Sequence, residues 1–263
     1  MAMRARAIMY HDVVEGGRYG ASGFAGEGAD VYKVDRGDFL RHLRAIHDAA
    51  AGTVGTLRQR SEWREGYPVL LTFDDGGESA HSIIAGMLEE HGWRGHFFVT
   101  TGRIGTAGFM SAEQIRDLHR RGHVIGSHSH THPIRMAVLS GKEIAEEWRR
   151  SVAALAEILD APVRVASVPG GYYSRQVAEE AARAGVDVLF NSEPTAQVKV
   201  VDGCLVLGRY VVQRGMGAEW AGGFAKGKGS FCWRQALLWK AKKAAKAVGG
   251  ERYVRVRERL LKR

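Results

Sequence analysis

The stretch "VLLTFDDGG", residues Val69–Gly77, is the part of the sequence from which the fold and the function are read. Its nearly continuous apolar run is typical of a strand that is buried on both faces of a parallel sheet. The run ends on two adjacent carboxylates, Asp74 and Asp75, which are followed by two glycines. Chemistry in parallel α/β proteins lies at the C-terminal ends of strands, so this pair indicates a functional site. Taken alone, the four residues also fit a solvated turn or a helix N-cap.

Seven apolar runs alternate with helical patterns along the chain, which predicts βαβ units and a parallel sheet. Seven strands in about 225 residues fit a barrel better than a small open sheet. The runs lie within residues 4–14, 67–73, 96–101, 123–133, 163–169, 186–190 and 204–212. Helical patterns occupy residues 36–50, 78–92, 111–122, 141–160 and 174–185.

The composition of the 263-residue chain is ordinary for a globular protein, with 45% hydrophobic and 25% charged residues. No apolar run approaches the roughly 18 residues of a membrane span, and the N-terminus has no apolar core of a secretory signal. Cys204 and Cys232 lack the spacing of metal ligands, so we expect reduced thiols. Together these features predict a cytoplasmic protein.

The net charge of +9 is concentrated in the C-terminal part of the chain. Residues 226–263 hold 13 of the 38 Lys/Arg and 2 of the 29 Asp/Glu, which leaves 25 basic and 27 acidic residues in 1–225. We therefore predict two parts: a nearly neutral catalytic barrel, residues 1–225, and a basic amphipathic helical tail, residues 226–263.

The stretch "HSHTH", His128–His132, follows the fourth predicted strand. In an extended or turning loop, residues i, i+2 and i+4 share one side, so the first and last histidines can meet one metal ion. Two histidines and one carboxylate, with positions left for water, are typical of a catalytic metal site rather than a structural one. A polar loop of surface histidines is the alternative.

A metal ion would also explain the paired carboxylates. With Asp75 as a ligand, Asp74 stays free beside the site and can act as a general base. Hydrolysis of an amide further needs an acid that protonates the leaving amine. His11, which follows the first predicted strand, is a candidate for that acid, although a lone histidine is often structural.

The segment "VPGGYYS", Val168–Ser174, follows another predicted strand. Pro169 and the glycines indicate a tight loop, in which the N–H of Gly170 is a candidate donor to an oxyanion. Tyr172 and Tyr173 could form a wall against a sugar ring. An ordinary turn explains the spacing equally well.

With "TFDDG", "HSHTH" and the later Pro-Gly loop, residues 5–215 resemble the polysaccharide deacetylases of carbohydrate esterase family four. This resemblance implies an α/β fold, a distorted (β/α)7 TIM-like barrel, and hydrolytic removal of acetyl groups from sugars with a divalent metal, usually Zn2+ and alternatively one such as Co2+. Carried over by motif, it implies that Asp74 is the base and that Asp75, His128 and His132 bind the metal. The loop Pro169–Tyr173 would then line the carbohydrate groove.

Two departures from the family pattern have consequences for the site. The arginine that usually holds the catalytic aspartate is replaced by Ser167, and we expect Arg209, near the end of a later strand, to take its place. No histidine follows His132, so the usual C-terminal acid is missing. The N-terminal "MYHDVV" resembles the permuted arrangement of poly-N-acetylglucosamine deacetylases, which favours His11 as the acid.

The tail combines lysines with an apolar stripe that includes Trp233 and Leu237, a pattern suited to an anionic membrane surface. It equally fits a helix packed on the barrel. The membrane reading predicts a peripheral protein at the inner membrane face, with a lipid- or nucleotide-linked amino sugar as substrate. No nucleic-acid-binding pattern is evident, so nucleic acid is not the expected partner.

N-deacetylation of an amino sugar has three alternatives. Deformylation of a lipid-linked amino sugar would use the same residues. Ser167 raises a second alternative, a catalytically inactive carbohydrate-binding barrel. Phosphoryl transfer at the aspartates lacks a glycine-rich phosphate loop.

Overall fold

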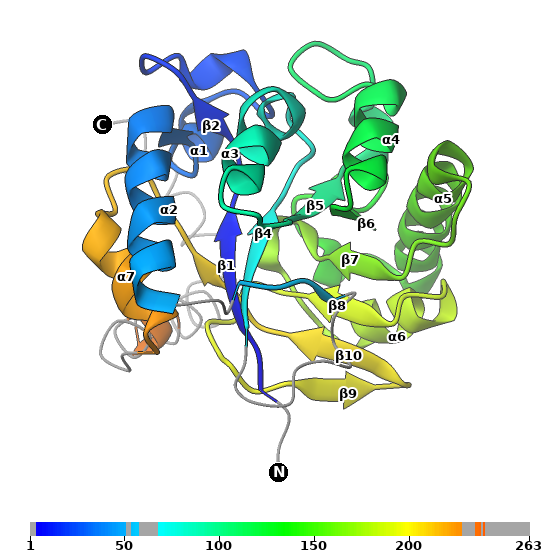
Figure 1. Ribbon diagram of the computed structural model, residues 1–263. Coiled ribbons are helices and arrows are strands. Elements are labelled where there is room, and N and C mark those ends of the chain that lie inside the picture. Colours follow the sequence, from blue (N-terminus) through cyan, green and yellow to red (C-terminus); the bar gives the residue numbers. More distant parts are fainter. Residues whose placement is uncertain (1–3, 51–53, 58–67, 228–234, 238, 240–263) are drawn as a thin grey trace.

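The computed structural model describes residues 4–50, 54–57, 68–227, 235–237 and 239 (Figure 1). A strongly curled sheet of nine strands has the order β11-β1-β4-β5-β6-β7-β8-β10-β9. Eight strands run parallel, and β9 is antiparallel to β10. The strands are β1 (Arg6–Tyr10), β4 (Val69–Phe73), β5 (His96–Val99), β6 (Val124–Ser127), β7 (Val165–Ser167), β8 (Val188–Phe190), β9 (Lys199–Val201), β10 (Cys204–Leu207) and β11 (Tyr210–Val211). The predicted distorted α/β barrel is confirmed.

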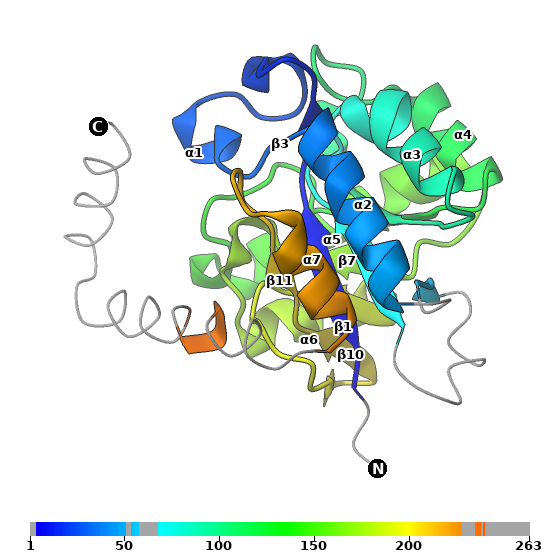
Figure 2. The same cartoon turned by 60° about the vertical axis from the view of Figure 1, so that its left-hand side comes forward.

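Helices lie outside the curl (Figure 1), and all of them except α7, which follows the last strand, connect one strand to the next. They are α2 (Arg36–Ala50), α3 (Ala85–Glu89), α4 (Ala112–Arg120), α5 (Gly141–Leu159), α6 (Arg175–Arg183) and α7 (Ala218–Ala225). Helices α2 and α7 pack side by side over β1 (Figure 2). The loop between β1 and α2 contains the short helix α1 (Glu27–Asp30) and the small parallel pair β2 (Val13–Val14) and β3 (Val34–Asp35).

The last predicted strand, residues 204–212, is divided in the structure. Its first half, β10, pairs with β8, whereas its second half, β11, pairs with β1 at the other end of the sheet. The division falls at Gly208, where an added Cβ would lie 2.2 Å from the carbonyl oxygen of Glu193. One segment therefore links the two ends of the curl, and it brings Arg209 to the junction.

Strand β9 was not predicted. It is a three-residue edge strand that pairs only with β10, and two of its residues are exposed. The dipeptide Asp202-Gly203 at its turn is a hairpin signal that the sequence offered.

Local sequence signals explain several element boundaries. The predicted helix 36–50 has the same bounds in the structure. Ser111 and Gln114 form a capping box at the start of α4, and Ser140 and Glu143 form a second one at α5.

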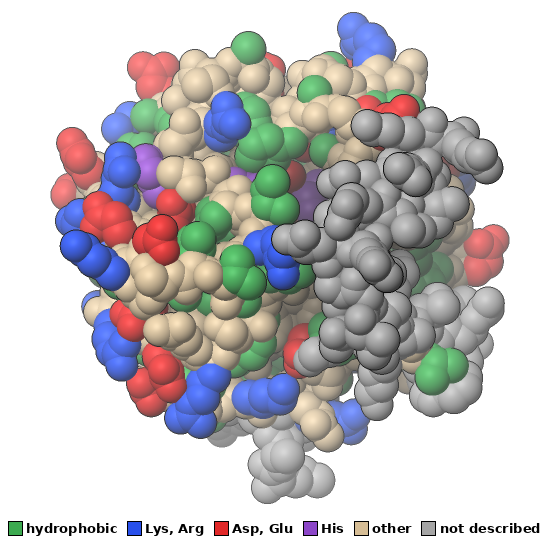
Figure 3. Space-filling model, turned by 180° about the vertical axis from the view of Figure 1, so that it is seen from behind, with side chains coloured by type: hydrophobic (Ala, Val, Ile, Leu, Met, Phe, Trp, Pro, Cys, Tyr) green, Lys and Arg blue, Asp and Glu red, His purple; other side chains and the backbone are tan. Residues whose placement is uncertain are grey.

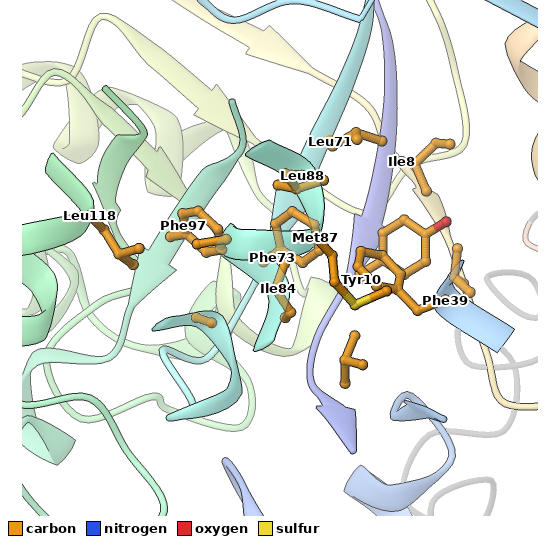
Figure 4. Packing of buried hydrophobic residues seen from close by; sticks show 14 of the residues in the cluster. Ile8, Tyr10, Phe39, Leu71, Phe73, Ile84, Met87, Leu88, Phe97 and Leu118 are labelled. Atoms are coloured by element: carbon orange, nitrogen blue, oxygen red, sulfur yellow. The ribbon is translucent and has the colours of Figure 1, made fainter. Parts of the chain in front are cut away.

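Alternating strand residues serve two cores. One set packs outward against the helices, as Tyr10, Phe73 and Phe97 do in Figure 4. The other set fills the interior of the curl and includes Phe98 and Phe190. The guanidinium carbon of the fully buried Arg209 lies 5.7 Å from the centre of each of these two rings. The apolar interior therefore ends in a buried positive charge, directly below the site.

The tail prediction lies almost wholly outside the described residues, so the division into 1–225 and 226–263 stays a prediction. In the part of the chain that the structure describes, no helix is both long and apolar enough to cross a membrane. Cys204 is a buried free thiol, as expected. Burial raises its pKa to about 12, which keeps it unreactive.

Candidate active site and metal centre

The loop after β4 positions the two aspartates differently. Asp74 continues the strand through a hydrogen bond from its N–H to the carbonyl of Tyr10, 3.1 Å long. Asp75 adopts the left-handed conformation, with φ of 76°. This reversal explains how adjacent strand residues, which normally point to opposite faces, present both carboxylates to one site.

The loop after β6 is similarly constrained. Ser129 and His132 have φ of 63° and 59°, and the N–H of His132 donates to Oγ of Ser129 at 3.1 Å. Glu147 on α5 accepts hydrogen bonds from the N–H groups of His130 and Thr131. Three of the five non-glycine residues with positive φ in the described chain belong to the site, which indicates strain held by the surrounding structure.

Asp75, His128 and His132 converge on one point, as predicted. One ligand atom from each lies within 4.8 Å of the others. Nε2 of His128 is 3.4 Å and Nε2 of His132 is 3.5 Å from Oδ1 of Asp75. Nδ1 of His128 lies 3.0 Å from the carbonyl oxygen of Ser167, which leaves Nε2 to face the carboxylate. Such a partner fixes the imidazole tautomer that metal ligation requires, so the donor set fits a divalent cation.

Asp74 lies next to this triad and is held by Arg209, as the sequence suggested. Nη1 and Nη2 of Arg209 donate to Oδ1 and Oδ2 of Asp74, both at 2.7 Å. Nη2 also donates to Oγ of Ser167 at 2.6 Å, and this hydroxyl donates to Oδ2 of Asp74. The serine that replaces the usual arginine is therefore a bridge within the same cluster. It does not leave the aspartate without support.

The charges of the cluster oppose the cost of burial. Burial alone would raise the pKa of Asp74, but the charge and hydrogen bonds of Arg209 together with the charges of His128 and His11 outweigh burial and lower that pKa. Burial opposes ionisation of Asp75 too, yet His128, His11 and His132 hold its pKa well below the usual range. Burial and the neighbouring His128 lower the pKa of His132 to about 4. The two carboxylates are therefore ionised and His132 is a neutral donor at physiological pH, as metal binding requires.

His11, which follows β1, lies near the two aspartates. Its charge contributes to the low pKa of both Asp74 and Asp75, which places it near the site. Its ring centre is 5.0 Å from that of Tyr32, and its buried Nδ1 has no hydrogen-bond partner among the described residues. Ring packing rather than a carboxylate therefore holds this histidine. Its role as the acid stays a prediction.

Asp12 fastens the His11 loop to the aspartate loop. Its Oδ1 accepts hydrogen bonds from Ser22 at 2.6 Å and Ser79 at 2.7 Å, and its side chain is buried. Gly77 must lack a side chain here, because an added Cβ would lie 2.0 Å from Oδ1 of Asp12. Burial raises the pKa of Asp12. We call Asp12, Ser22, Ser79 and Gly77 the loop clamp.

The segment after β7 approaches the loop after β6, residues 128–135, which we call the metal loop. The predicted role of the segment in the groove requires this approach. Pro169 is buried, and Gly170 has φ of 62° and lies against the carbonyl of Ile134. The ring of Tyr172 packs under Arg135, whereas Tyr173 packs against the core beneath α6. The two tyrosines do not form one wall. Their contact with substrate stays a prediction.

Two aromatic residues near the site were missed from sequence. Phe24 packs on the candidate ligand His132, with ring centres 4.7 Å apart, and Tyr32 packs on His11. Both come from the irregular loop after β1, where no periodicity marks them. A surface hollow of about 560 Å³ beside α5 shares only Thr131 with the site motifs and is outside the metal centre.

Comparison with known proteins supports the geometry. Residues 64–189 match the sequence pattern described as polysaccharide deacetylase, a range that contains Asp74, Asp75, His128 and His132. "Putative polysaccharide deacetylase YxkH" of Bacillus subtilis (strain 168) is 22% identical over 222 residues, which cover 82% of this chain and 74% of that protein.

Two solved structures show the same fold. The deacetylase PplD of Streptococcus pyogenes, in complex with acetate, aligns with a TM-score of 0.67 and 18% identity over 83% of this chain and 96% of that one. IcaB from Ammonifex degensii aligns with a TM-score of 0.65 and 22% identity over 86% and 97%. The curled barrel and the Asp75–His128–His132 triad agree with this match, so residues 64–189 carry the sequence pattern and the metal-binding triad of polysaccharide deacetylases, which are hydrolases.

Proposed function

We propose that this protein is a metal-dependent hydrolase that removes the N-acetyl group from an N-acetylated amino sugar. The observation that supports this best is the convergence of Asp75, His128 and His132 within 4.8 Å. Beside them lies Asp74, a buried carboxylate oriented by two hydrogen bonds from Arg209. A ligand triad with an adjacent oriented base suits hydrolysis by an activated water.

Each residue then has one part in the reaction. A divalent metal such as Zn2+ or Co2+, held by Asp75, His128 and His132, would polarise the acetyl carbonyl and acidify a water molecule. Asp74 accepts a proton from the water as its oxygen attacks the carbonyl carbon. The N–H of Gly170 donates to the developing oxyanion. The C–N bond breaks as His11 gives a proton to the departing nitrogen, and acetate and a free amine result.

The substrate in this proposal is a polysaccharide or its lipid- or nucleotide-linked precursor. A precursor at the inner membrane face suits a cytoplasmic protein whose basic tail, residues 226–263, binds anionic lipid. A chain truncated at Gly229 should then fold normally but no longer sediment with anionic vesicles. Sedimentation of the truncated chain would contradict the membrane part of the proposal only.

The experiment that tests the chemistry measures acetate and formate released by zinc- or cobalt-loaded protein from N-acetylated and N-formylated amino sugars. We expect acetate from the wild type, and a loss of about 100-fold or more in Asp74→Asn. Arg149→Gln on the exposed face of α5 is the matched control. Formate instead of acetate would identify a deformylase. Sugar binding without turnover, unchanged in Asp74→Asn, would identify an inactive carbohydrate-binding barrel.

A further inference from the structure

Three exposed arginines lie over aromatic rings in the described chain, and all three are on loops at the C-terminal ends of strands. Arg103 follows β5, Arg135 follows β6 and Arg214 follows β11. Their guanidinium carbons lie 5.4 Å from the ring centre of Phe24, 5.6 Å from that of Tyr172 and 4.5 Å from that of Tyr19. The pairs therefore gather at the same end of the barrel as the candidate metal centre.

Arg103 is linked to a candidate metal ligand through a single aromatic ring. Phe24, over which it lies, packs on His132. The turn that contains Arg103 is fixed to the metal loop, because the N–H groups of Thr101 and Gly102 donate to the carbonyls of Ser129 and His130. The position of this guanidinium relative to the triad is therefore set by the scaffold.

Arg135 lies in the loop that follows β6, as the two histidines of the triad do. It is three residues beyond His132, and its partner Tyr172 belongs to the predicted groove loop. Arg214 extends the series toward His11, since its N–H donates to the carbonyl of Val31, next to the Tyr32 that packs on His11. The three guanidinium groups therefore lie on loops that carry or contact residues of the site.

Several arginines on the outer helices have a charge partner that these three lack. Arg120, Arg149 and Arg175 each pair with a carboxylate on their own helix. Among the described residues, no carboxylate pairs with Arg103, Arg135 or Arg214. A guanidinium stacked on a ring keeps its N–H edge available, and this edge matches phosphate and carboxylate oxygens. Figure 3 shows one face of the molecule on which histidine and basic side chains lie among hydrophobic ones.

We propose that Arg103, Arg135 and Arg214 form an anion subsite around the metal centre, so that the preferred substrate is an N-acetylated amino sugar that bears a phosphate or a carboxylate. This inference rests on the proposed function for the acetyl group but concerns a different part of the substrate. General attraction to the barrel would not produce this preference, because residues 1–225 contain 25 basic and 27 acidic residues. The basic residues of 226–263 are the same in the wild type and in the variants below, so their attraction cancels in the comparison.

The test measures binding separately from turnover. Titration calorimetry on the metal-loaded protein compares N-acetylglucosamine 1-phosphate, a disaccharide of N-acetylglucosamine with glucuronate, and neutral di-N-acetylchitobiose. We expect at least one anionic sugar to bind about tenfold or more tightly than the neutral one, with the difference shrinking as salt rises. The phosphate and carboxylate arms identify which anion is preferred.

Variants identify which positive charges cause the preference for the anionic sugar. In Arg103→Gln/Arg135→Gln the preference for the anionic sugar should fall about tenfold, whereas Arg149→Gln should keep it. No preference in the wild type would overturn the proposal. A preference that persists after Arg214→Gln is added to the double variant would overturn it as well, because other groups would then bind the anion. Acetate release by the same proteins tests the proposed function, so binding without acetate would contradict that function and leave the subsite established.

Discussion

The metal half of the site and the loop that brings His11 to it are held in different ways. Asp75, His128 and His132 lie on strand-end loops with left-handed backbone at two of them and a hydrogen-bonded imidazole at the third. His11 belongs to a long loop, and its ring is held by packing on Tyr32 and, through the next residue, by the loop clamp. The metal ligands therefore lie on loops of the barrel itself, whereas the His11 loop, the proposed proton-donating half, is joined to the barrel by packing and by the loop clamp. Disturbing the two separately should therefore have separable effects.

The largest effect should come from removing the metal half. In His128→Ala/His132→Ala we expect metal content to fall from about one ion per chain to none and acetate release to fall at least about 1,000-fold. Mass spectrometry of bound metal and circular dichroism measure loss of the ion and retention of the fold. Equal metal content in the variant and the wild type would refute the assigned ligand set.

Arg209→Lys should leave the metal and weaken the base. Lysine cannot form two parallel hydrogen bonds to Asp74, so we expect kcat to fall about 100-fold while metal content stays unchanged. Arg209 lowers the pKa of Asp74, and its loss should raise that pKa. Because the base must be ionised, the acidic limb of the rate profile should then move to higher pH. Unchanged activity together with an unchanged profile would show that Arg209 does not support the base.

The metal half could be predicted from the sequence because its residues lie in two short motifs, each contiguous in the sequence. "FDDGG" and "HSHTH" each follow an apolar run, and strand ends of a parallel sheet meet at one edge. Arg209 could be anticipated by the same reasoning, since it also follows a strand. The division of its segment into β10 and β11 could not, because the approach of Gly208 to Glu193 exists only in the folded, curled sheet.

The aromatic contacts of the His11 loop were out of reach for a different reason. Phe24 and Tyr32 lie in irregular backbone, where neither a helical nor a strand period marks a buried face. Their partners, His132 and His11, are distant in sequence, so only tertiary packing brings them together. The loop clamp is similar, since the requirement for Gly77 comes from Asp12, 65 positions earlier in the chain.

Gly77→Ala should disturb only the loop that carries His11, and not the metal ligands. The new methyl group would meet the buried Asp12 carboxylate, and such overpacking costs about 1–3 kcal/mol. We expect acetate release to fall about tenfold as His11 is displaced, with one metal ion per chain retained. Gly86→Ala on α3, where an added Cβ meets nothing within 4 Å, is the matched control. Loss of metal in Gly77→Ala would show that the two halves are not separable.

The smallest effect concerns neither half but the scaffold, and it allows pH effects on folding to be separated from those on activity. His123 is fully buried, its Nδ1 accepts a hydrogen bond from the N–H of Gly95, and its Nε2 lies 3.1 Å from Glu89. Burial lowers its pKa from 6.5 to about 4. Between these values the unfolded chain binds more protons than the folded one, so stability falls as pH decreases from 6.5 to 4, by at most about 3 kcal/mol.

Urea unfolding of the metal-free His128→Ala/His132→Ala background at pH 7.0 and 5.0 measures this loss without a contribution from metal release. Adding His123→Gln should lower stability at pH 7.0 but reduce the difference between the two pH values, because the titrating imidazole is gone. An unchanged difference would assign the pH dependence to other groups, with the carboxylates of the site as the first candidates. The acidic limb of activity could then no longer be ascribed to Asp74 without first correcting for unfolding.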